Sequence, residues 1–145
     1  MTGPPPCISI QGLAAGAIGL VAKLTLRIDF DGERAIGPGK VRLLELIDEL
    51  RSIAAAGRAM EMSYRRAWLL VDNLNHCFRQ PVVAAQHGGR AGGGAALTAF
   101  GRSLVDQYRA IEADADRISR DRLRALQDEL RSAEASLPVR SVKRR

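Results

Sequence analysis

Five glycines lie within seven positions in the segment HGGRAGGGAALT (87–98), a density that points to phosphate chemistry. Backbone N–H groups of a glycine-rich loop can cradle a phosphate, but a P-loop also needs a lysine and then Ser or Thr after its last glycine. No lysine follows this run, and no GxGxxG register fits the dinucleotide-binding pattern. The glycines therefore predict close approach of the backbone to some other surface rather than a nucleotide site.

Two arginines near the start of the segment SYRRAWLLVDNLNHCF (63–78) form a second candidate site: Arg65 and Arg66. An arginine in the first turn of a helix can bond guanine O6 and N7 in the DNA major groove. The same side chains would also suit the solvated face of an ordinary amphipathic helix. Both interpretations stay open from the sequence.

Catalytic and metal-binding groups are sparse by comparison. Cys7 and Cys77 form no CxxC pair, and only His76 and His87 could join them as ligands. Neither a zinc site nor a disulfide framework is predicted, and no nucleophile and base stand out as a pair. We predict a protein that is not an enzyme, with no metal, no other cofactor and no evident small-molecule site.

The composition favours one mainly helical domain with an anionic partner. Of the 145 residues, 46% are apolar but only 4% aromatic, so the core must consist largely of aliphatic and small side chains. The net charge is +6, and four basic residues fall in the last six positions: Arg140, Lys143, Arg144 and Arg145. We predict a basic disordered tail over residues 136–145, which leaves the body only mildly basic.

The N-terminal residues 1–22 contain a short apolar segment without a basic n-region, and this segment is too short to span a bilayer. We interpret them as a disordered leader or an over-extended start. No membrane contact is expected, and the lack of a disulfide framework favours the cytoplasm.

Residues 23–29 (KLTLRID) alternate apolar and polar side chains, which is the period of a half-buried strand. The segment DGERAIGPGK (31–40) is dense in turn residues and predicts a loop. Pro38 can open a helix that runs to about Leu50, because apolar residues then recur on one helical face.

Two serines are candidate N-caps for a pair of helices that a short turn separates. Ser52 would begin SIAAAGRAM (52–60), whose small residues permit close packing, and Ser63 would begin the longer helix over 63–78. This arrangement is the helix-turn-helix pattern. The apolar face of the second helix consists of Ala67, Val71, Leu74 and Phe78. Trp68 lies at the edge of that face, and we expect it to pack in the core.

A β-hairpin is predicted directly after the second helix. The short apolar segments PVVAAQ (81–86) and AALT (95–98) are joined by the glycine run, with Arg90 at its tip. In this place the hairpin would be a wing, with backbone N–H groups and Arg90 against phosphates. A plain flexible loop is the alternative.

Thr98 can cap a final helix over residues 99–135. Its apolar residues follow a coiled-coil seam that includes Leu104, Tyr108, Ile111 and Ile118. A helix of this length would expose the seam in a monomer, so we predict that it mediates a homodimer. Folding back on the first helix is the competing way to bury it.

The segments RSIAAAGRAMEMSYRRAWLLVDNLN and PVVAAQHGGRAGGGAALTAFG, in this order, resemble the N-terminal DNA-binding domain of the ModE-type molybdate-responsive regulators, which are LysR-like winged helices. The resemblance covers about residues 23–112. Its most specific parts are SYRRAW, at the start of the family's recognition helix, and GGRAGGGAALTAFG, its wing.

The resemblance implies a mainly α fold with a small β-hairpin wing. A winged helix-turn-helix would span residues 23–98, and a long C-terminal dimerisation helix would span 99–135. It also places Ser63, Tyr64, Arg65 and Arg66 at double-stranded DNA, with Arg90 on the wing. The chain departs from the family in two ways. Glu61 stands where the turn usually has glycine, and the chain stops after its long helix, so the family's molybdate-binding domain is expected to be absent.

The resemblance implies a bacterial, sequence-specific transcriptional regulator, and a homodimer would bind an inverted-repeat operator. Through the resemblance, its target genes would be related to molybdate. The alternative is a winged-helix adaptor that binds proteins without reading DNA, since the body of the chain is only mildly basic.

Overall fold

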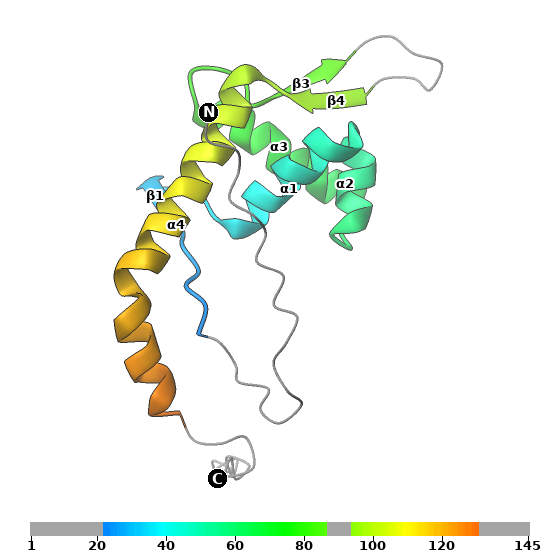
Figure 1. Ribbon diagram of the computed structural model, residues 1–145. Helices are drawn as coiled ribbons and strands as arrows, with labels where there is room; N and C mark the ends of the chain where they lie inside the picture. The colour runs from blue at the N-terminus through cyan, green and yellow to red at the C-terminus, as the bar shows by residue number, and fades with distance from the viewer. Residues whose placement is uncertain (1–21, 87–93, 131–145) are drawn as a thin grey trace, which may run out of the picture.

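The computed structural model describes residues 22–86 and 94–130. The fold is mainly helical, with a small antiparallel hairpin and a long C-terminal helix, as predicted (Figure 1). In chain order the elements are β1 (Ile28–Asp31), β2 (Arg34–Ile36), α1 (Pro38–Leu50), α2 (Ile53–Ala59), α3 (Tyr64–Cys77), β3 (Val83–Gln86), β4 (Gly94–Leu97) and α4 (Ala99–Asp128). This is the architecture expected of a winged helix-turn-helix followed by a long helix.

Side-chain caps begin three of the four helices at the predicted residues. In each, a hydroxyl oxygen accepts a hydrogen bond from the backbone N–H three residues further on: Ser52 from Ala55, Ser63 from Arg66 and Thr98 from Gly101. Such caps typically contribute about 1 kcal/mol each. Helix α1 begins instead at Pro38, whose missing N–H would have no partner in a first turn.

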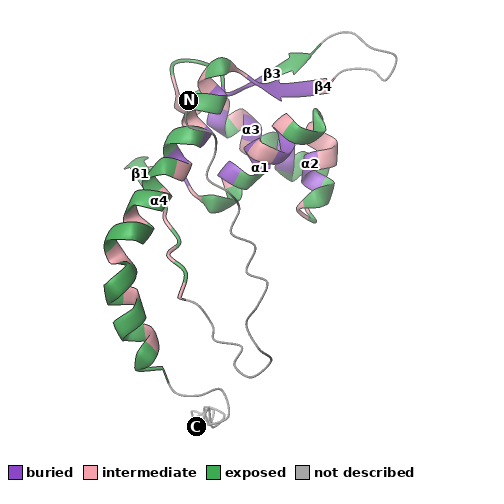
Figure 2. Ribbon diagram, viewed as in Figure 1, coloured by how far each residue is buried: buried purple, intermediate pink, exposed green. Residues whose placement is uncertain are grey.

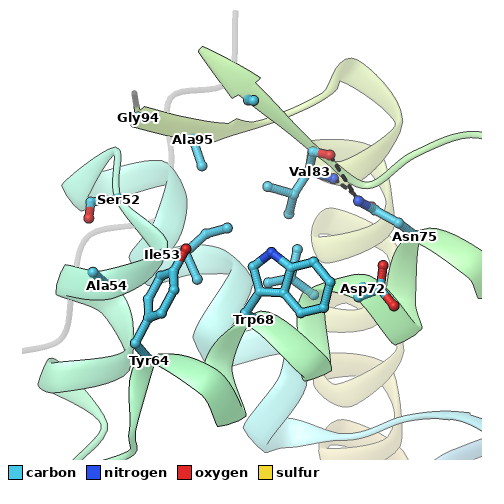
Figure 3. A pocket seen from close by; sticks show the side chains of 12 residues that line it. Ser52, Ile53, Ala54, Tyr64, Trp68, Asp72, Asn75, Val83, Gly94 and Ala95 are labelled. Carbon is cyan, nitrogen blue, oxygen red and sulfur yellow. Dashed lines mark hydrogen bonds between the residues drawn. The ribbon is translucent and has the colours of Figure 1, made fainter. Parts of the chain in front are cut away.

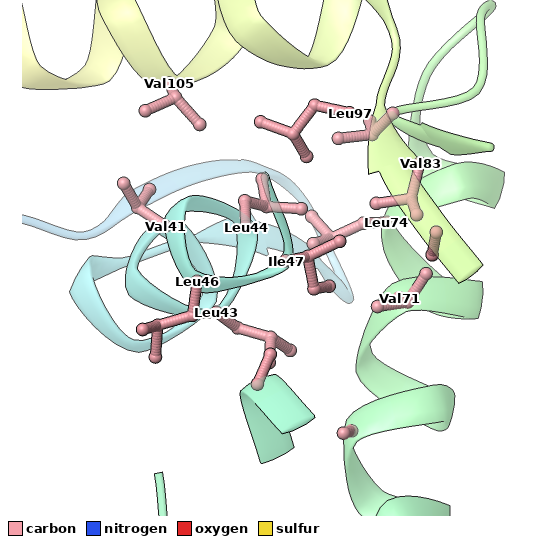
Figure 4. Packing of buried hydrophobic residues seen from close by; sticks show 14 of the residues in the cluster. Val41, Leu43, Leu44, Leu46, Ile47, Val71, Leu74, Val83, Leu97 and Val105 are labelled. Atoms are coloured by element: carbon pink, nitrogen blue, oxygen red, sulfur yellow. The ribbon is translucent and has the colours of Figure 1, made fainter. Parts of the chain in front are cut away.

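Helix α1 lies at the centre of the hydrophobic core, between α2, strand β4 and α4 (Figure 4). Its residues Val41, Leu44 and Ile47 are fully buried, and they meet Leu74 of α3 and Leu97 of β4 in one cluster. Each such burial stabilises the fold by about 1.5 to 3 kcal/mol. Strands β1 and β2 pair as one antiparallel hairpin, and β3 and β4 pair as a second hairpin. Figure 2 shows that burial is concentrated where α1, α3 and the second hairpin meet, whereas the far half of α4 is mostly exposed.

The predicted strand over residues 23–29 is wrong in its bounds. Strand β1 begins only at Ile28 and pairs with β2, which lies inside the segment predicted to be a loop. The turn between them contains Gly32 in the left-handed region, at φ 38°. Turn residues therefore do bend the chain here, but two short strands fit around the bend.

The segment before β1 is extended without pairing to a strand. Leu24 and Leu26 are half-buried, whereas Lys23 and Thr25 are exposed. The alternation of apolar and polar residues therefore correctly predicts that one side of this segment is buried. The burial is against α4: the Tyr108 hydroxyl donates to the Leu26 carbonyl oxygen at 2.7 Å. Nearer the C-terminal end of α4, the side-chain oxygen of Gln127 accepts the backbone N–H of Ala22. An alternating segment can thus pack on a helix as well as in a sheet.

Helix α4 ends at Asp128, which is earlier than the predicted end near residue 135. The N–H groups of Glu129 and Leu130 bond carbonyl oxygens three residues back, and this tightening closes the helix. The predicted leader and the predicted basic tail at 136–145 lie outside the described residues. Among the helices that the structure describes, none is both long and apolar enough to cross a membrane.

Candidate nucleic-acid interface

Helices α2 and α3 cross closely because small residues face one another at the contact. A Cβ added at Gly57 would lie 3.0 Å from the Cβ of Ala67, which is tighter than ordinary van der Waals contact. The Gly57 carbonyl oxygen also accepts the N–H of Met62, so the same residue helps to close the turn. A glycine in α2 and an alanine in α3 together fix the angle at which α3 leaves the domain.

The turn between α2 and α3 contains Glu61 in the left-handed region, at φ 57°. At this position, the resemblance noted in the sequence analysis implies that the related family usually has glycine. A non-glycine residue there costs roughly 1 kcal/mol. The turn is held by a hydrogen bond from the Glu61 N–H to the Arg58 carbonyl oxygen.

The two faces of α3 divide as predicted, with one exception. Ala67, Val71 and Leu74 are buried, whereas Arg65 and Arg66 are exposed. Trp68 is the exception: it was expected in the core, but its side chain is 46% exposed. Because residues advance by about 100° along a helix, Trp68 lies beside the buried row that Ala67 begins rather than on it.

Trp68 and Tyr64 instead form one wall of a hollow of about 500 Å³ (Figure 3). The hollow lies between α3, the start of α2 and the second hairpin. Its other lining residues include Ser52, Ile53, Asn75, Val83 and Ala95. Both aromatic rings thus lie on the side of α3 that faces the hairpin; Tyr64 is itself a predicted DNA-contacting residue, and Trp68 lies one helical turn after it.

Asn75 connects α3 to the second hairpin. Its Oδ1 accepts the backbone N–H groups of Val82 at 2.8 Å and Val83 at 3.0 Å, and its Nδ2 donates to the Val83 carbonyl oxygen at 3.1 Å. The sequence analysis missed this residue. The available signal was an asparagine one helical turn after the buried Val71, directly before the segment that forms β3.

The hairpin is also fastened to the junction of α1 and α2. The Ala95 N–H donates to the Arg51 carbonyl oxygen at 3.1 Å, and a Cβ added at the neighbouring Gly94 would lie 2.8 Å from that same oxygen. The last glycine of the run is therefore needed for close approach of the backbone, but the approached surface belongs to the chain itself. Residues 87–93, including Arg90 and His87, lie outside the described residues.

The exposed arginines at the start of α3 differ from most arginines of α1 and α4. Arg109 is held by the Glu45 carboxylate at 2.7 and 2.9 Å and by Glu112 at 2.6 Å. Within residues 22–86 and 94–130, neither Arg65 nor Arg66 forms an ion pair. Their guanidinium groups can therefore meet an external anion without first breaking a contact to a described carboxylate.

The hydrogen bonds from Arg109 hold the pKa of Glu45 below its ordinary value, while burial acts in the opposite direction. The same pair raises the pKa of Arg109, chiefly through the hydrogen bond to Glu45. This ion pair joins α1 to α4 and fixes the direction in which the long helix leaves the domain.

The predicted dimer face on α4 divides into two parts. Tyr108 is only 2% exposed and belongs to the core of its own chain, and Leu104 packs against that core. Helix α4 does contact α1, as the alternative of folding back anticipated. Ile111 and Ile118 remain exposed, the latter at 71%. Any contact with a second copy would therefore use the distal part of the predicted seam.

The described parts of the chain contain no group of three or more His, Cys, Asp or Glu side chains arranged to hold a metal ion. Of the two histidines, only His76 is described, and its Nδ1 lies near the Asp72 backbone oxygen on the exposed side of α3. Cys77 is a free thiol.

Comparison with known proteins relates the chain to proteins named ModE, MopA and MopB, although no family model matches the chain. The chain is 38% identical to the molybdenum transport protein ModE of Azotobacter vinelandii over 61% of its own length and 33% of that protein. It is 46% identical to the molybdenum-pterin-binding protein MopB of Rhodobacter capsulatus over 54% of its length and 29% of that protein.

A third relative is the DNA-binding transcriptional dual regulator ModE of Escherichia coli K12, at 29% identity over 60% of this chain and 33% of that protein. The chain thus spans about a third of the length of the curated relatives it matches. These matches support a relationship to the ModE proteins over roughly three fifths of the chain.

Proposed function

We propose that this protein binds double-stranded DNA sequence-specifically and regulates transcription. The observation that carries the proposal is the position of α3: its start is capped and exposed, while its opposite face is fixed on α2 and on the hairpin. A rigid helix that presents its first turns to the outside is what a major-groove reader requires. Relatives that match about three fifths of the chain are named as transcriptional regulators.

Within this proposal, Arg65 and Arg66 read base edges, because an arginine can bond guanine through two atoms at once. Ser63 and Tyr64 contact the sugar-phosphate backbone beside them. Arg90, which lies outside the described residues, contacts phosphates from the hairpin tip. Such contacts position the helix in register with the bases.

The assembly that we propose is a cytoplasmic homodimer on an inverted repeat, joined through Ile111 and Ile118 of α4. Two copies of α3 would then enter major grooves about one turn of DNA apart, or a multiple of it. The names of the relatives include molybdenum transport and molybdenum-pterin binding, which supports genes related to molybdate as the targets. The chain is proposed to have no enzymatic activity.

Selection of bound DNA from a random pool tests the proposal. Several rounds with the purified full chain should enrich a sequence with two inverted half-sites, and a mobility shift should show tighter binding to this sequence than to unselected DNA. A pool that stays random after selection would contradict sequence-specific binding.

A protein-binding adaptor is the second candidate, and one observation favours it. Tyr64, Trp68 and Leu69 expose large apolar surface on α3, which is common at protein interfaces. The same selection separates the two functions, because an adaptor would bind DNA weakly and without sequence preference.

A further inference from the structure

The outer surface of α3 is apolar directly beside Arg65. A shallow hollow of about 360 Å³ lies there, lined by Tyr64, Arg65, Trp68 and Leu69. Leu69 is 50% exposed and does not belong to the core cluster. Three large apolar side chains on the accessible face of one short helix require a partner surface that is itself partly apolar.

In the DNA major groove the apolar group on base edges is the C5 methyl of thymine. We propose that the hollow of Tyr64, Trp68 and Leu69 receives thymine methyl groups, and that Leu69 is the residue that contacts them. This inference rests on the proposed DNA-binding function and specifies which bases it distinguishes. Arg65 would select guanine by hydrogen bonds, while Leu69 selects thymine by burial of its methyl group.

The spacing of the two residues predicts where the two bases lie. Leu69 follows Arg65 by four residues, so both side chains lie on one face of α3, about 6 Å apart along the axis. Successive base pairs are about 3.4 Å apart along the duplex. With α3 lying along the major groove, a thymine contacted by Leu69 should lie one or two base pairs from the base that Arg65 contacts.

Charge favours DNA over a protein as the occupant of this surface. Three arginines, Arg58, Arg65 and Arg66, are exposed around the start of α3, and they outnumber the two nearby carboxylates, Glu61 and the half-exposed Asp72 of the neighbouring hollow. Phosphates on both sides of the major groove would meet this positive rim while the base edges meet the apolar centre. A thymine-rich major groove offers both kinds of surface at once.

Replacement of thymine by deoxyuridine tests the inference, because it removes only the methyl group. Duplexes of the selected sequence are made with one thymine position replaced at a time, and binding is measured by fluorescence anisotropy at one salt concentration. The wild-type chain should lose about fourfold in affinity at one or two positions per half-site, as expected for one methyl group returned to water. Positions outside the contact should show no change.

The variant Leu69→Ala assigns the effect to its residue. It should bind the thymine duplex more weakly and should no longer distinguish thymine from deoxyuridine at those positions, whereas Arg65→Ala should keep that discrimination. Leu126→Ala, an exposed leucine near the C-terminal end of α4, is the matched control and should discriminate like the wild type. Circular dichroism melts should show that all three variants fold.

Three results would overturn the inference, and they are distinguishable from one another. Equal wild-type binding to thymine and deoxyuridine duplexes of a selected sequence would remove thymine reading while leaving DNA binding intact. Unchanged discrimination in Leu69→Ala would assign the methyl contact to another residue. A pool that yields no preferred sequence would remove the proposed function and this inference together, and would leave protein docking as the use of the surface.

Discussion

The side-chain amide of Asn75 binds both backbone groups of Val83, accepting its N–H at 3.0 Å and donating to its carbonyl oxygen at 3.1 Å. The side chain of Asn75, on α3, therefore sets the position of β3. Helix and hairpin are connected as one unit, so both can approach a partner in a fixed relative position.

Asn75→Ala should loosen this connection and destabilise the fold. The backbone N–H groups of Val82 and Val83 would lose their shared acceptor, and part-buried donors left unsatisfied cost about 1 to 3 kcal/mol. Urea denaturation measures the loss. Asn73→Ala is the control, since Asn73 is exposed and its bond with Lys40 should contribute less than 1 kcal/mol. Equal stability of the two variants would contradict the role given to Asn75.

Gly94→Ala should be destabilising, because the added Cβ would lie 2.8 Å from the Arg51 carbonyl oxygen and would push β4 from the α1–α2 junction. Overpacking against backbone typically costs about 1 to 3 kcal/mol. Gly39→Ala in the first turn of α1 meets no atom within 4 Å and should be neutral or stabilising by up to about 1 kcal/mol. In thermal unfolding, Gly94→Ala should lower the midpoint temperature, whereas Gly39→Ala should leave it unchanged or raise it. A harmless Gly94→Ala would show that β4 does not approach Arg51 so closely in solution.

The Glu45–Arg109 pair should make stability depend on pH in the acid range. Because hydrogen bonds from Arg109 lower the pKa of Glu45 in the folded state, the pair stabilises the fold above the ordinary glutamate pKa of 4.5. This contribution is lost as the pH falls through the lowered pKa. Both side chains are partly exposed, so the effect should be about 1 kcal/mol or less.

Glu45→Gln tests this pH dependence by urea denaturation at pH 7 and pH 3. The variant should be less stable than the wild type at pH 7, and the difference should shrink at pH 3. Glu49→Gln, on an exposed residue of the same helix, should show no such trend. A Glu45→Gln deficit that is the same at both pH values would exclude the ion pair as its cause.

Ile118→Asp should convert the proposed dimer into monomers. Ile118 is 71% exposed in the single chain, and its burial in a dimer would contribute about 1.5 to 3 kcal/mol per copy. Arg120→Asp, two residues further and on the opposite side of α4, should leave the assembly unchanged. Light scattering at micromolar concentration measures the mass. A wild-type chain that is already monomeric would contradict both the dimer and the inverted repeat.

Helix starts and the order of the elements were predictable because their signals are local. Ser52, Ser63 and Thr98 each cap a helix through a bond to a residue three positions away, so nothing distant is required. The buried face of α3 was equally readable from the spacing of Ala67, Val71 and Leu74.

The errors have a common physical origin. Periodicity shows which side of a segment is buried but not what buries it, so the alternation before Ile28 was assigned to a sheet although α4 covers it. For the same reason Tyr108 was assigned to a dimer face, whereas it is buried within its own chain and its hydroxyl donates to the Leu26 carbonyl oxygen. Trp68 was placed in the core because it lies at the edge of the apolar face of α3, but an edge position leaves its side chain 46% exposed. The glycine run predicted close approach of the backbone but not its target, because Gly94 approaches Arg51, which is distant in the sequence. Asn75 stood in a readable position on α3, but its partners Val82 and Val83 lie across a loop and are not evident from a local pattern.

The most direct test of DNA reading by α3 is the ratio of affinities for the selected sequence and for random DNA of equal length at equal salt. The wild-type chain should prefer the selected sequence by about a thousandfold or more. Arg65→Ala should reduce this preference by about tenfold or more, because it removes a bidentate base contact. Arg117→Ala, an exposed arginine of α4, should leave it unchanged. A wild-type ratio near one, or a preference that Arg65→Ala does not alter, would contradict the central claim.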